Sequence, residues 1–381
     1  MPGGLQVLLP ASDGNLVAGL PCALRTAHRA HEELAPSRIV FCGQGPKFQN
    51  RWQGQLKGLG SPVACADGGP IAREIEAQAP LLVLSPDGFP EACALKDFVR
   101  QAGMSGQPVR WLWGQETVAA YYPKAGELVS GQDTAAQLAQ KALSSAETVQ
   151  RPQAGWLSAK DPGSIQKAEE ALCAQLPRKT DGYLARFDRR LSITLSRVLL
   201  KTPITPNQIT TASFILGLLG AWGLAWGSYP WQLLGALILW FCCILDGCDG
   251  EVARLKLLCT KGGAAYDLAA DHLSHLATFA AVPVGVYRAD PQVHFLLPGI
   301  LLVTGFLGCM ASVWWLVLRV PEEKRGAFSL LIERVASRDY VYLILILAAL
   351  GRLEWFLWTA AFGSHLFYLG LWGLRLRRPS P

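Results

Sequence analysis

Four aspartates carry the clearest chemical signal in this sequence: Asp246, Asp249, Asp267 and Asp271. They lie where strongly apolar stretches of membrane length meet. A carboxylate at the centre of a membrane helix costs roughly 2.5–3.5 kcal/mol on insertion scales, so a group of them needs compensation. Carboxylate oxygens are hard ligands that suit Mg²⁺ or Mn²⁺. The pattern therefore predicts a site for divalent metal ions.

The spacing of these residues indicates how they would meet. Asp249 and Ala253 follow Asp246 by three and seven residues, which places the three on one face of a helix. Asp267 and Asp271 are four residues apart and share a face of the next helix. Because only a short turn separates the two helices, we expect them to be antiparallel neighbours with the two pairs of aspartates pointing at each other.

Two glycines flank this arrangement, Gly250 and Gly263. Glycine has no Cβ atom, so the backbone at these positions can approach a partner or a ligand closely. A plainer interpretation is that the aspartates cap wet helix ends and pair with Arg254. That interpretation accounts for any one aspartate more easily than for the whole pattern, and we favour the metal cluster.

The complete run, D-x-x-D-G-x-x-A-R-x8-G-x3-D-x3-D from Asp246 to Asp271, resembles the signature of the CDP-alcohol phosphatidyltransferase family. The resemblance implies a membrane enzyme that transfers a phosphatidyl or other substituted phosphoryl group from a CDP-activated donor to an alcohol and releases CMP. It also implies two Mg²⁺ or Mn²⁺ ions and a homodimer. Loss of a proton from the alcohol acceptor needs a base, and attack on a diphosphate needs its charge neutralised.

The resemblance assigns roles residue by residue. Asp246, Asp249, Asp267 and Asp271 correspond to metal ligands, and Asp271 also to the catalytic base. The surface that receives the cytidine diphosphate corresponds to Gly250, Ala253, Arg254 and Gly263. The family also has a P-N-x-[IL]-T segment at the entry to its first span, which corresponds here to Asn207 and Thr210. The same segment reads more plainly as the start of a helix.

Composition agrees with a membrane protein, because 51% of the residues are hydrophobic and only 17% are charged. We expect an all-α domain with six transmembrane helices, at residues 209–226, 231–245, 264–287, 293–318, 335–351 and 353–374. Basic residues gather in alternate loops. The positive-inside rule therefore predicts a multi-pass protein of the inner membrane with both termini and the aspartates on the cytoplasmic side.

The helix expected at Tyr183–Leu200 has an apolar stripe and arginines on its other faces. This pattern is typical of an amphipathic helix lying on the membrane surface beside the first span. An ordinary helix packed on a neighbouring domain would show a similar pattern. Further along the chain, Arg334 and Arg338 precede the fifth expected span and could bind a phosphorylated acceptor. They could equally be topological anchors.

Residues 1–150 alternate short apolar stretches with helical ones and predict an α/β layered cytoplasmic domain. Strands that look buried and parallel are expected at 6–9, 38–42, 80–84 and 110–113, with a helix at 20–34. Residues 151–181 are expected to form a linker with a helix, and 182–381 the membrane domain. No motif for nucleic-acid binding is present, so the expected partners are the CDP-linked donor, the alcohol acceptor and the bilayer.

The first domain resembles a sugar-phosphate nucleotidyltransferase that has degenerated. The Gly-rich turn with an arginine is replaced at 10–15, and the lysine expected near Cys22 is missing. Since triphosphate binding needs basic groups, we expect the domain to be inactive. The overall layout is similar to bifunctional inositol-phosphate cytidylyltransferase/di-inositol-phosphate-phosphate synthases, which leaves a bifunctional enzyme as an alternative. A metal-ion transporter is a more distant one, because transport does not require the glycines and Arg254 at fixed offsets.

Overall fold

The computed structural model describes residues 4–11, 16–43, 45–66, 71, 74–129, 133–146, 148–150, 155–176, 183–315 and 340–376. The chain divides into two compact units. The first comprises Met1–Gln175 together with Arg254–Leu258, and the second comprises Leu176–Ala253 together with Cys259–Pro381. Arg334 and Arg338 lie outside the described residues, as do parts of the fourth and fifth expected spans.

The first unit is an α/β domain built on a seven-stranded sheet with the order β10-β8-β9-β6-β1-β4-β5. The strands are β1 (Gln6–Ala11), β2 (Leu16–Val17), β3 (Leu20–Pro21), β4 (Arg38–Gly43), β5 (Val63–Ala66), β6 (Leu81–Leu84), β7 (Gly88–Pro90), β8 (Val109–Trp113), β9 (Glu116–Tyr122), β10 (Thr148–Gln150) and β11 (Trp156–Ser158). The helices are α1 (Cys22–Leu34), α2 (Gly45–Arg51), α3 (Gln53–Lys57), α4 (Ala94–Ser105), η2 (Ala125–Glu127), α5 (Ala135–Ser145) and α6 (Pro162–Ala174).

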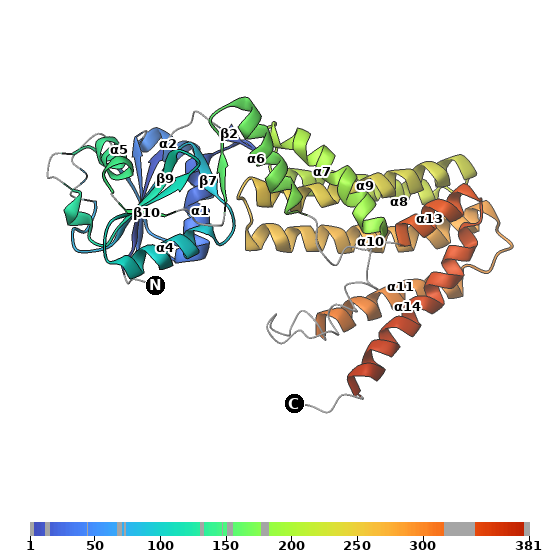
Figure 1. Cartoon of the computed structure of the whole chain (residues 1–381). Helices are drawn as coiled ribbons and strands as arrows, with labels where there is room; N and C mark the ends of the chain where they lie inside the picture. Colours follow the sequence, from blue (N-terminus) through green and yellow to red (C-terminus); the bar gives the residue numbers. More distant parts are fainter. Residues whose placement is uncertain are drawn as a thin grey trace. The chain divides into compact units, whose positions relative to one another are not determined.

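Alternation along the strands builds two cores, one on each face of the sheet. In β1, Val7 and Leu9 belong to the core beneath α1 and α4, whereas Leu8 belongs to the core beneath α5. The helices lie on opposite sides of the sheet accordingly (Figure 1). β1 pairs in parallel with both β4 and β6. The expected α/β layered fold is therefore present, with three of the predicted strands at its centre.

The strand expected at 110–113 is β8, and it runs in the same direction as β1, β4 and β6, as predicted. The antiparallel strand of the sheet is β9, which the sequence did not lead us to expect. β8 is parallel to β10 but antiparallel to β9, which is also antiparallel to β6. A tight turn joins β8 to β9, with Gly114 at a φ of 63°. Such a turn returns the chain at once beside the strand it has just left, and this makes an antiparallel hairpin.

The segment expected to be a linker with a helix holds that helix, α6, and also a short strand, β11. β11 pairs with β7, and α6 begins with a capping box in which the Asp161 side chain accepts from the backbone of Ser164. A small apolar cluster joins α6 to the domain through Ala168 and Phe89. Residues 155–175 consequently extend the first compact unit, because their apolar side chains are buried against it.

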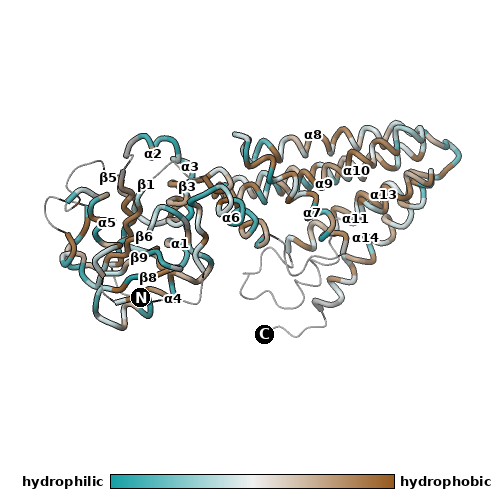
Figure 2. Tube along the Cα trace, turned by 45° about the horizontal axis from the view of Figure 1, so that its top comes forward, coloured by the Kyte–Doolittle hydropathy of each residue, from teal (hydrophilic) through white to brown (hydrophobic). Residues whose placement is uncertain are grey.

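The second unit is helical. Its helices are α7 (Tyr183–Leu200), α8 (Pro206–Ala225), α9 (Tyr229–Leu255), α10 (Lys261–Ala289), α11 (Leu296–Val313), α13 (Tyr340–Ala349) and α14 (Leu353–Leu376). Figure 2 shows hydrophobic residues along most of their length. Among the described helices, α8, α9 and α11 are long and apolar enough to cross a membrane, and α13 is a shorter apolar helix. The unit is thus a membrane-type helical domain, and the count of six spans stays a prediction.

Candidate metal centre

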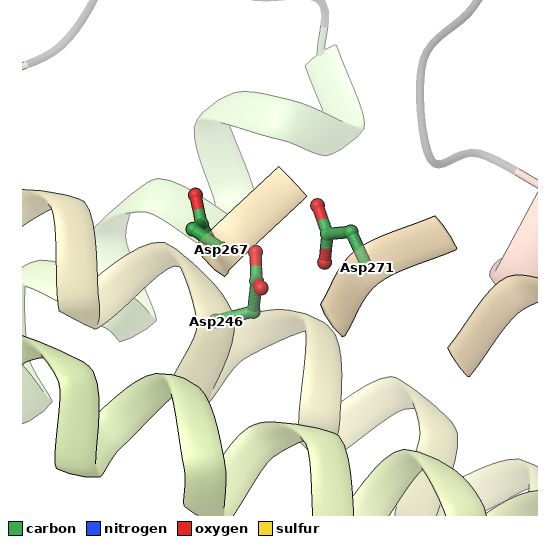
Figure 3. A group of neighbouring side chains, drawn as sticks. All are labelled: Asp246, Asp267 and Asp271. Atoms are coloured by element: carbon green, nitrogen blue, oxygen red, sulfur yellow. The ribbon is translucent and has the colours of Figure 1, made fainter. Parts of the chain in front are cut away.

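Three of the four aspartates meet between α9 and α10. Asp246, Asp267 and Asp271 each offer one carboxylate oxygen, and these oxygens all lie within 4.8 Å of one another. Figure 3 shows Asp246 projecting from one helix toward the pair on the facing helix. The spacing rule for helix faces accounts for this, since Asp267 and Asp271 are one turn apart on α10.

Close packing of the helices brings the aspartates together. α8 carries Gly217 where it meets α10, and a Cβ atom there would lie 2.0 Å from the Ser274 hydroxyl oxygen and 3.4 Å from the Cys242 sulfur of α9. Only glycine fits this position without displacing a neighbour. The site is therefore built on a three-helix contact, at which α8 supports both of the helices that carry the carboxylates.

The donor set fits a divalent cation. Three carboxylates lie within reach of one centre, and Asp246 is only 7% exposed. Like charges at such separations repel strongly where water is excluded, so a cation between them would offset a large electrostatic cost. All three donors are oxygens, which suits Mg²⁺ or Mn²⁺ better than a metal that prefers sulfur or imidazole.

Asp249 lies on the same face of α9 but is held differently. Its side chain is 5% exposed and accepts a hydrogen bond from the Thr210 hydroxyl of α8. It is not one of the three carboxylates whose oxygens lie within 4.8 Å of one another, although it interacts with Asp246 and Asp267. Thr210 thus contacts the motif directly, and it orients the fourth aspartate beside the other three.

Asn207 and Gly263 are also neighbours. A Cβ atom at Gly263 would lie 3.2 Å from the Asn207 side-chain oxygen and 2.9 Å from the Thr260 hydroxyl oxygen. Thr260 caps α10 by accepting from the Gly263 backbone N–H at 2.9 Å. Thr205 caps α8 in a capping box with Gln208. The start of α8 is therefore a capped helix terminus that also contributes Asn207 and Thr210 to this region.

The remaining predicted donor-site residues lie on α9. Gly250 and Ala253 are half-buried, and Arg254 is exposed in the last turn of the helix. Their part in receiving a cytidine diphosphate stays a prediction. The predicted roles of Arg334 and Arg338 rest on the sequence alone, since both lie outside the described residues.

Two cavities adjoin the cluster. A cavity of about 20 Å³ is lined by Asp246, Asp271, His275 and Tyr340, among others. A much larger one, of about 790 Å³, shares His275 and Tyr340 with it. Its lining is otherwise mainly apolar and comes from α10, α11, α13 and α14. The sequence reasoning missed His275, although its position one turn beyond Asp271 on the same helix was a signal that could have found it.

The helical unit matches a known protein family. Residues 203–367 match the family described as CDP-alcohol phosphatidyltransferase, which confirms for this part of the chain the resemblance drawn from the aspartate motif. The chain is 33% identical over 133 residues to a protein of Rubrobacter xylanophilus named bifunctional IPC transferase and DIPP synthase, a match that covers 35% of this chain and 30% of the relative. It is 27% identical over 212 residues to the protein of the same name from Archaeoglobus fulgidus, covering 54% of this chain and 41% of that one.

The chain therefore spans less than half the length of these curated relatives. Among solved structures it is similar to the phosphatidylinositol phosphate synthase PgsA1 of Mycobacterium tuberculosis with CDP-DAG bound, with a TM-score of 0.36 and 18% identity. That match covers 50% of this chain and 96% of the other.

Proposed function

We propose that this chain, whose residues 203–367 match the CDP-alcohol phosphatidyltransferase family, is an integral membrane transferase. It moves a phosphatidyl or other substituted phosphoryl group from a CDP-activated alcohol to an alcohol acceptor and releases CMP. One observation carries this proposal. The three motif aspartates Asp246, Asp267 and Asp271 come from two helices and present oxygens within 4.8 Å of one another.

The reaction follows from what these residues can bind. The acceptor hydroxyl gives its proton to Asp271, and its oxygen forms a bond to the phosphorus that bears the donor alcohol. The bond between this phosphorus and the oxygen that bridges the two phosphates breaks, and the bridging oxygen leaves with CMP. One or two Mg²⁺ or Mn²⁺ ions held by Asp246, Asp249, Asp267 and Asp271 would neutralise charge on the diphosphate and on the leaving group.

The large cavity favours a lipid among the substrates. Its mainly apolar lining and its volume of about 790 Å³ suit a hydrocarbon chain. It shares His275 and Tyr340 with the small cavity at Asp246 and Asp271, so a chain bound there would end at the carboxylates. A phosphatidyl group is therefore a suitable transferred group, and synthesis of a phospholipid is a suitable role.

The placement in the membrane is part of the proposal. Six spans would put both termini and the aspartates on the cytoplasmic side of the inner membrane. α7 would lie on the surface of the bilayer, because Leu184, Phe187 and Val198 are 41%, 50% and 61% exposed, which is costly in water and favourable in lipid. The active form would be a homodimer, as the family resemblance implies. Arg334 and Arg338 would bind a phosphorylated acceptor.

The first unit is proposed to be a scaffold without catalysis of its own. Arg25, a basic residue near the start of α1, is buried and donates hydrogen bonds to the carbonyl oxygens of Val17 and Ala18. Burial lowers the pKa of its guanidinium to about 10, so it stays charged at neutral pH. Its hydrogen bonds are used to hold the β2–β3 turn. The names of the relatives keep a bifunctional enzyme as the alternative.

A radiolabel assay tests the proposal. The purified full-length chain in liposomes is given labelled CDP-diacylglycerol or CDP-inositol, a panel of alcohols, and Mg²⁺, Mn²⁺ or EDTA. We expect CMP release and a labelled product with at least one alcohol, both abolished by EDTA. Uptake of Mg²⁺ or Mn²⁺ into the liposomes without CMP release from any donor would contradict the transferase and favour a metal-ion transporter.

A further inference from the structure

Glu251 is a fully buried carboxylate inside the aspartate run, at a position that the motif leaves open. It follows Gly250 on α9, and its exposed fraction is 0%. A buried charge of this kind destabilises a protein unless it is paired and hydrogen-bonded. Neither the metal cluster nor the proposed chemistry uses it, so its role needs a separate explanation.

Three donors on α7 satisfy this carboxylate. Arg189 donates to one oxygen at 2.9 Å and Ser192 to the same oxygen at 2.6 Å. Ser196 donates to the other oxygen at 2.8 Å. The two serines are 2% and 1% exposed. Hydrogen bonds that involve a charged group are stronger than those between neutral groups. All three hydrogen bonds here have the Glu251 carboxylate as their acceptor.

α7 also packs closely on the same turns of α9. Cys248 is fully buried, and its thiol donates to the Ser192 carbonyl oxygen at 3.4 Å. A Cβ atom at Gly247 would lie 3.3 Å from the Ser192 Cβ atom. The buried face of α7 is thus its small and polar face.

The helix period places this contact behind the metal site. With about 100° per residue, Gly247, Cys248 and Glu251 share one face of α9, while Asp246 and Asp249 share roughly the opposite face. α7 therefore packs on the face of α9 that is opposite Asp246 and Asp249, at the same helical turns. A ligand set of this kind has to be held to within about 0.5 Å, and the packing of its supporting residues sets that precision.

We propose that Glu251 is a positioning residue of the metal centre. Its carboxylate, held by Arg189, Ser192 and Ser196, ties α7 to the back of α9 and so sets the position of Asp246 and Asp249 relative to α10. The inference rests on the proposed function only in taking the aspartate cluster to be a cation site. Neutralising Glu251 leaves the Arg189 cation without its buried partner, and the loss should reach the aspartates through the helix backbone.

Binding of Mn²⁺ alone tests this, with electron paramagnetic resonance on the purified full-length chain and no donor or acceptor present. Changes to groups that support a metal's ligands typically weaken its affinity by about 10–100-fold. We expect Glu251→Gln to weaken Mn²⁺ affinity by about 10-fold and Ser196→Ala by less. Arg189→Met combined with Glu251→Met should lose less affinity than the sum of the two single changes, because no buried charge is then left unpaired.

Tyr342→Phe is the matched control. The Tyr342 hydroxyl lies near Trp240 and Cys243 of α9, but it donates to the Asp188 carboxylate and so joins α7 to α13 by a charge-assisted hydrogen bond whose donor and acceptor both lie outside α9. We expect this variant to lower thermal stability about as much as Ser196→Ala and to leave Mn²⁺ affinity unchanged. Unchanged affinity in both Glu251→Gln and Ser196→Ala would overturn the inference, as would an equal loss in Tyr342→Phe. If the parent chain binds no Mn²⁺, the cation site itself is wrong, and with it both the proposed function and this inference.

Discussion

Asp271 and Asp246 both line the small cavity beside the metal centre, whereas Asp267 lies one turn before Asp271 on α10. His275 follows Asp271 by one turn and reaches the same cavity. Asp271 is thus a potential metal ligand. It is also the α10 aspartate that lines the small cavity, where an acceptor hydroxyl could enter. At the scale of single residues, this is the side chain whose change should be the most informative.

Asp271→Asn should abolish transfer and leave membrane insertion intact. Asparagine keeps the shape of the side chain but cannot take up the proton of the acceptor alcohol. General-base catalysis contributes roughly 10²–10⁴-fold to a rate, so we expect at least a 100-fold loss of kcat. Measured CMP release above about a tenth of the parent rate would rule out Asp271 as the base.

Thr210→Val should weaken metal-dependent binding of the CDP donor. The change removes the hydrogen bond that the Thr210 hydroxyl donates to the buried carboxylate of Asp249 and nearly preserves side-chain volume. A hydrogen bond to a charged group is worth about 1.5–3 kcal/mol, so we expect a loss of about 10-fold or more in affinity. Calorimetric titration with a CDP-alcohol, with and without Mg²⁺, measures it.

Thr211→Val supplies the control on the same helix. Its hydroxyl bonds the Asn207 carbonyl oxygen and the Tyr266 hydroxyl at an exposed position, away from the buried carboxylate of Asp249. An affinity that falls equally in both variants would point to a general effect of replacing a threonine hydroxyl with a methyl group on α8, and the specific role of Thr210 would be refuted.

At the scale of elements, the contact between α8 and α10 decides whether the aspartates meet. A Cβ atom at Gly217 would fall 2.0 Å from the Ser274 hydroxyl oxygen, too close for any side chain to be added without movement. Ser274 also lines the small cavity that holds Asp246 and Asp271. Packing between α8 and α10 at Gly217 and Ser274 is therefore coupled to the geometry of the metal centre.

Gly217→Ala should destabilise the helical unit and weaken Mg²⁺-dependent activity together. Overpacking of a well-packed interior typically costs about 1–3 kcal/mol. Adding Ser274→Gly should restore much of both, since it removes the atoms that clash. Thermal unfolding in detergent and CMP release measure the two effects, and Gly370→Ala, where nothing lies within 4 Å of the new Cβ, is the control. No rescue by Ser274→Gly would contradict the coupling.

At the scale of the whole molecule, the two compact units carry different chemistry. The helical unit holds the aspartates, whereas the first unit has a complete α/β sheet with apolar cores on both faces. A domain with its own core should fold without the membrane part. The sequence of the first unit departs from that of a sugar-phosphate nucleotidyltransferase mainly in the basic residues that would bind a nucleoside triphosphate.

Residues 1–175 should therefore fold in water and show no transfer of a cytidylyl group from CTP. Circular dichroism checks folding, and pyrophosphate release with inositol phosphate or another phosphorylated alcohol checks activity. The full-length chain assayed in parallel guards against a domain that needs the rest of the protein. Turnover of CTP by either form would make the protein bifunctional.

Local pattern determined much of this protein in advance. The period of the aspartate run placed Asp267 and Asp271 on one face of α10 and Asp246 on a helix that faces it, because side-chain direction in a helix follows from spacing alone. Apolar stretches likewise predicted the central strands of the first unit and the end of α1 at Leu34, whereas α1 begins at Cys22 because Leu20–Pro21 form β3. The helix at Tyr183–Leu200 also has the bounds that its pattern predicted.

Tertiary structure decided what lies opposite each residue. Nothing in the local pattern indicates that Thr210 binds Asp249, or that the small polar face of α7 is the buried one and satisfies Glu251. Likewise, the local pattern did not predict that β9 would enter the sheet antiparallel between β6 and β8. Periodicity along the chain fixes which side chains share a face. The partner of that face is chosen by contacts between segments far apart in sequence, through close packing and the requirement that buried polar groups be satisfied.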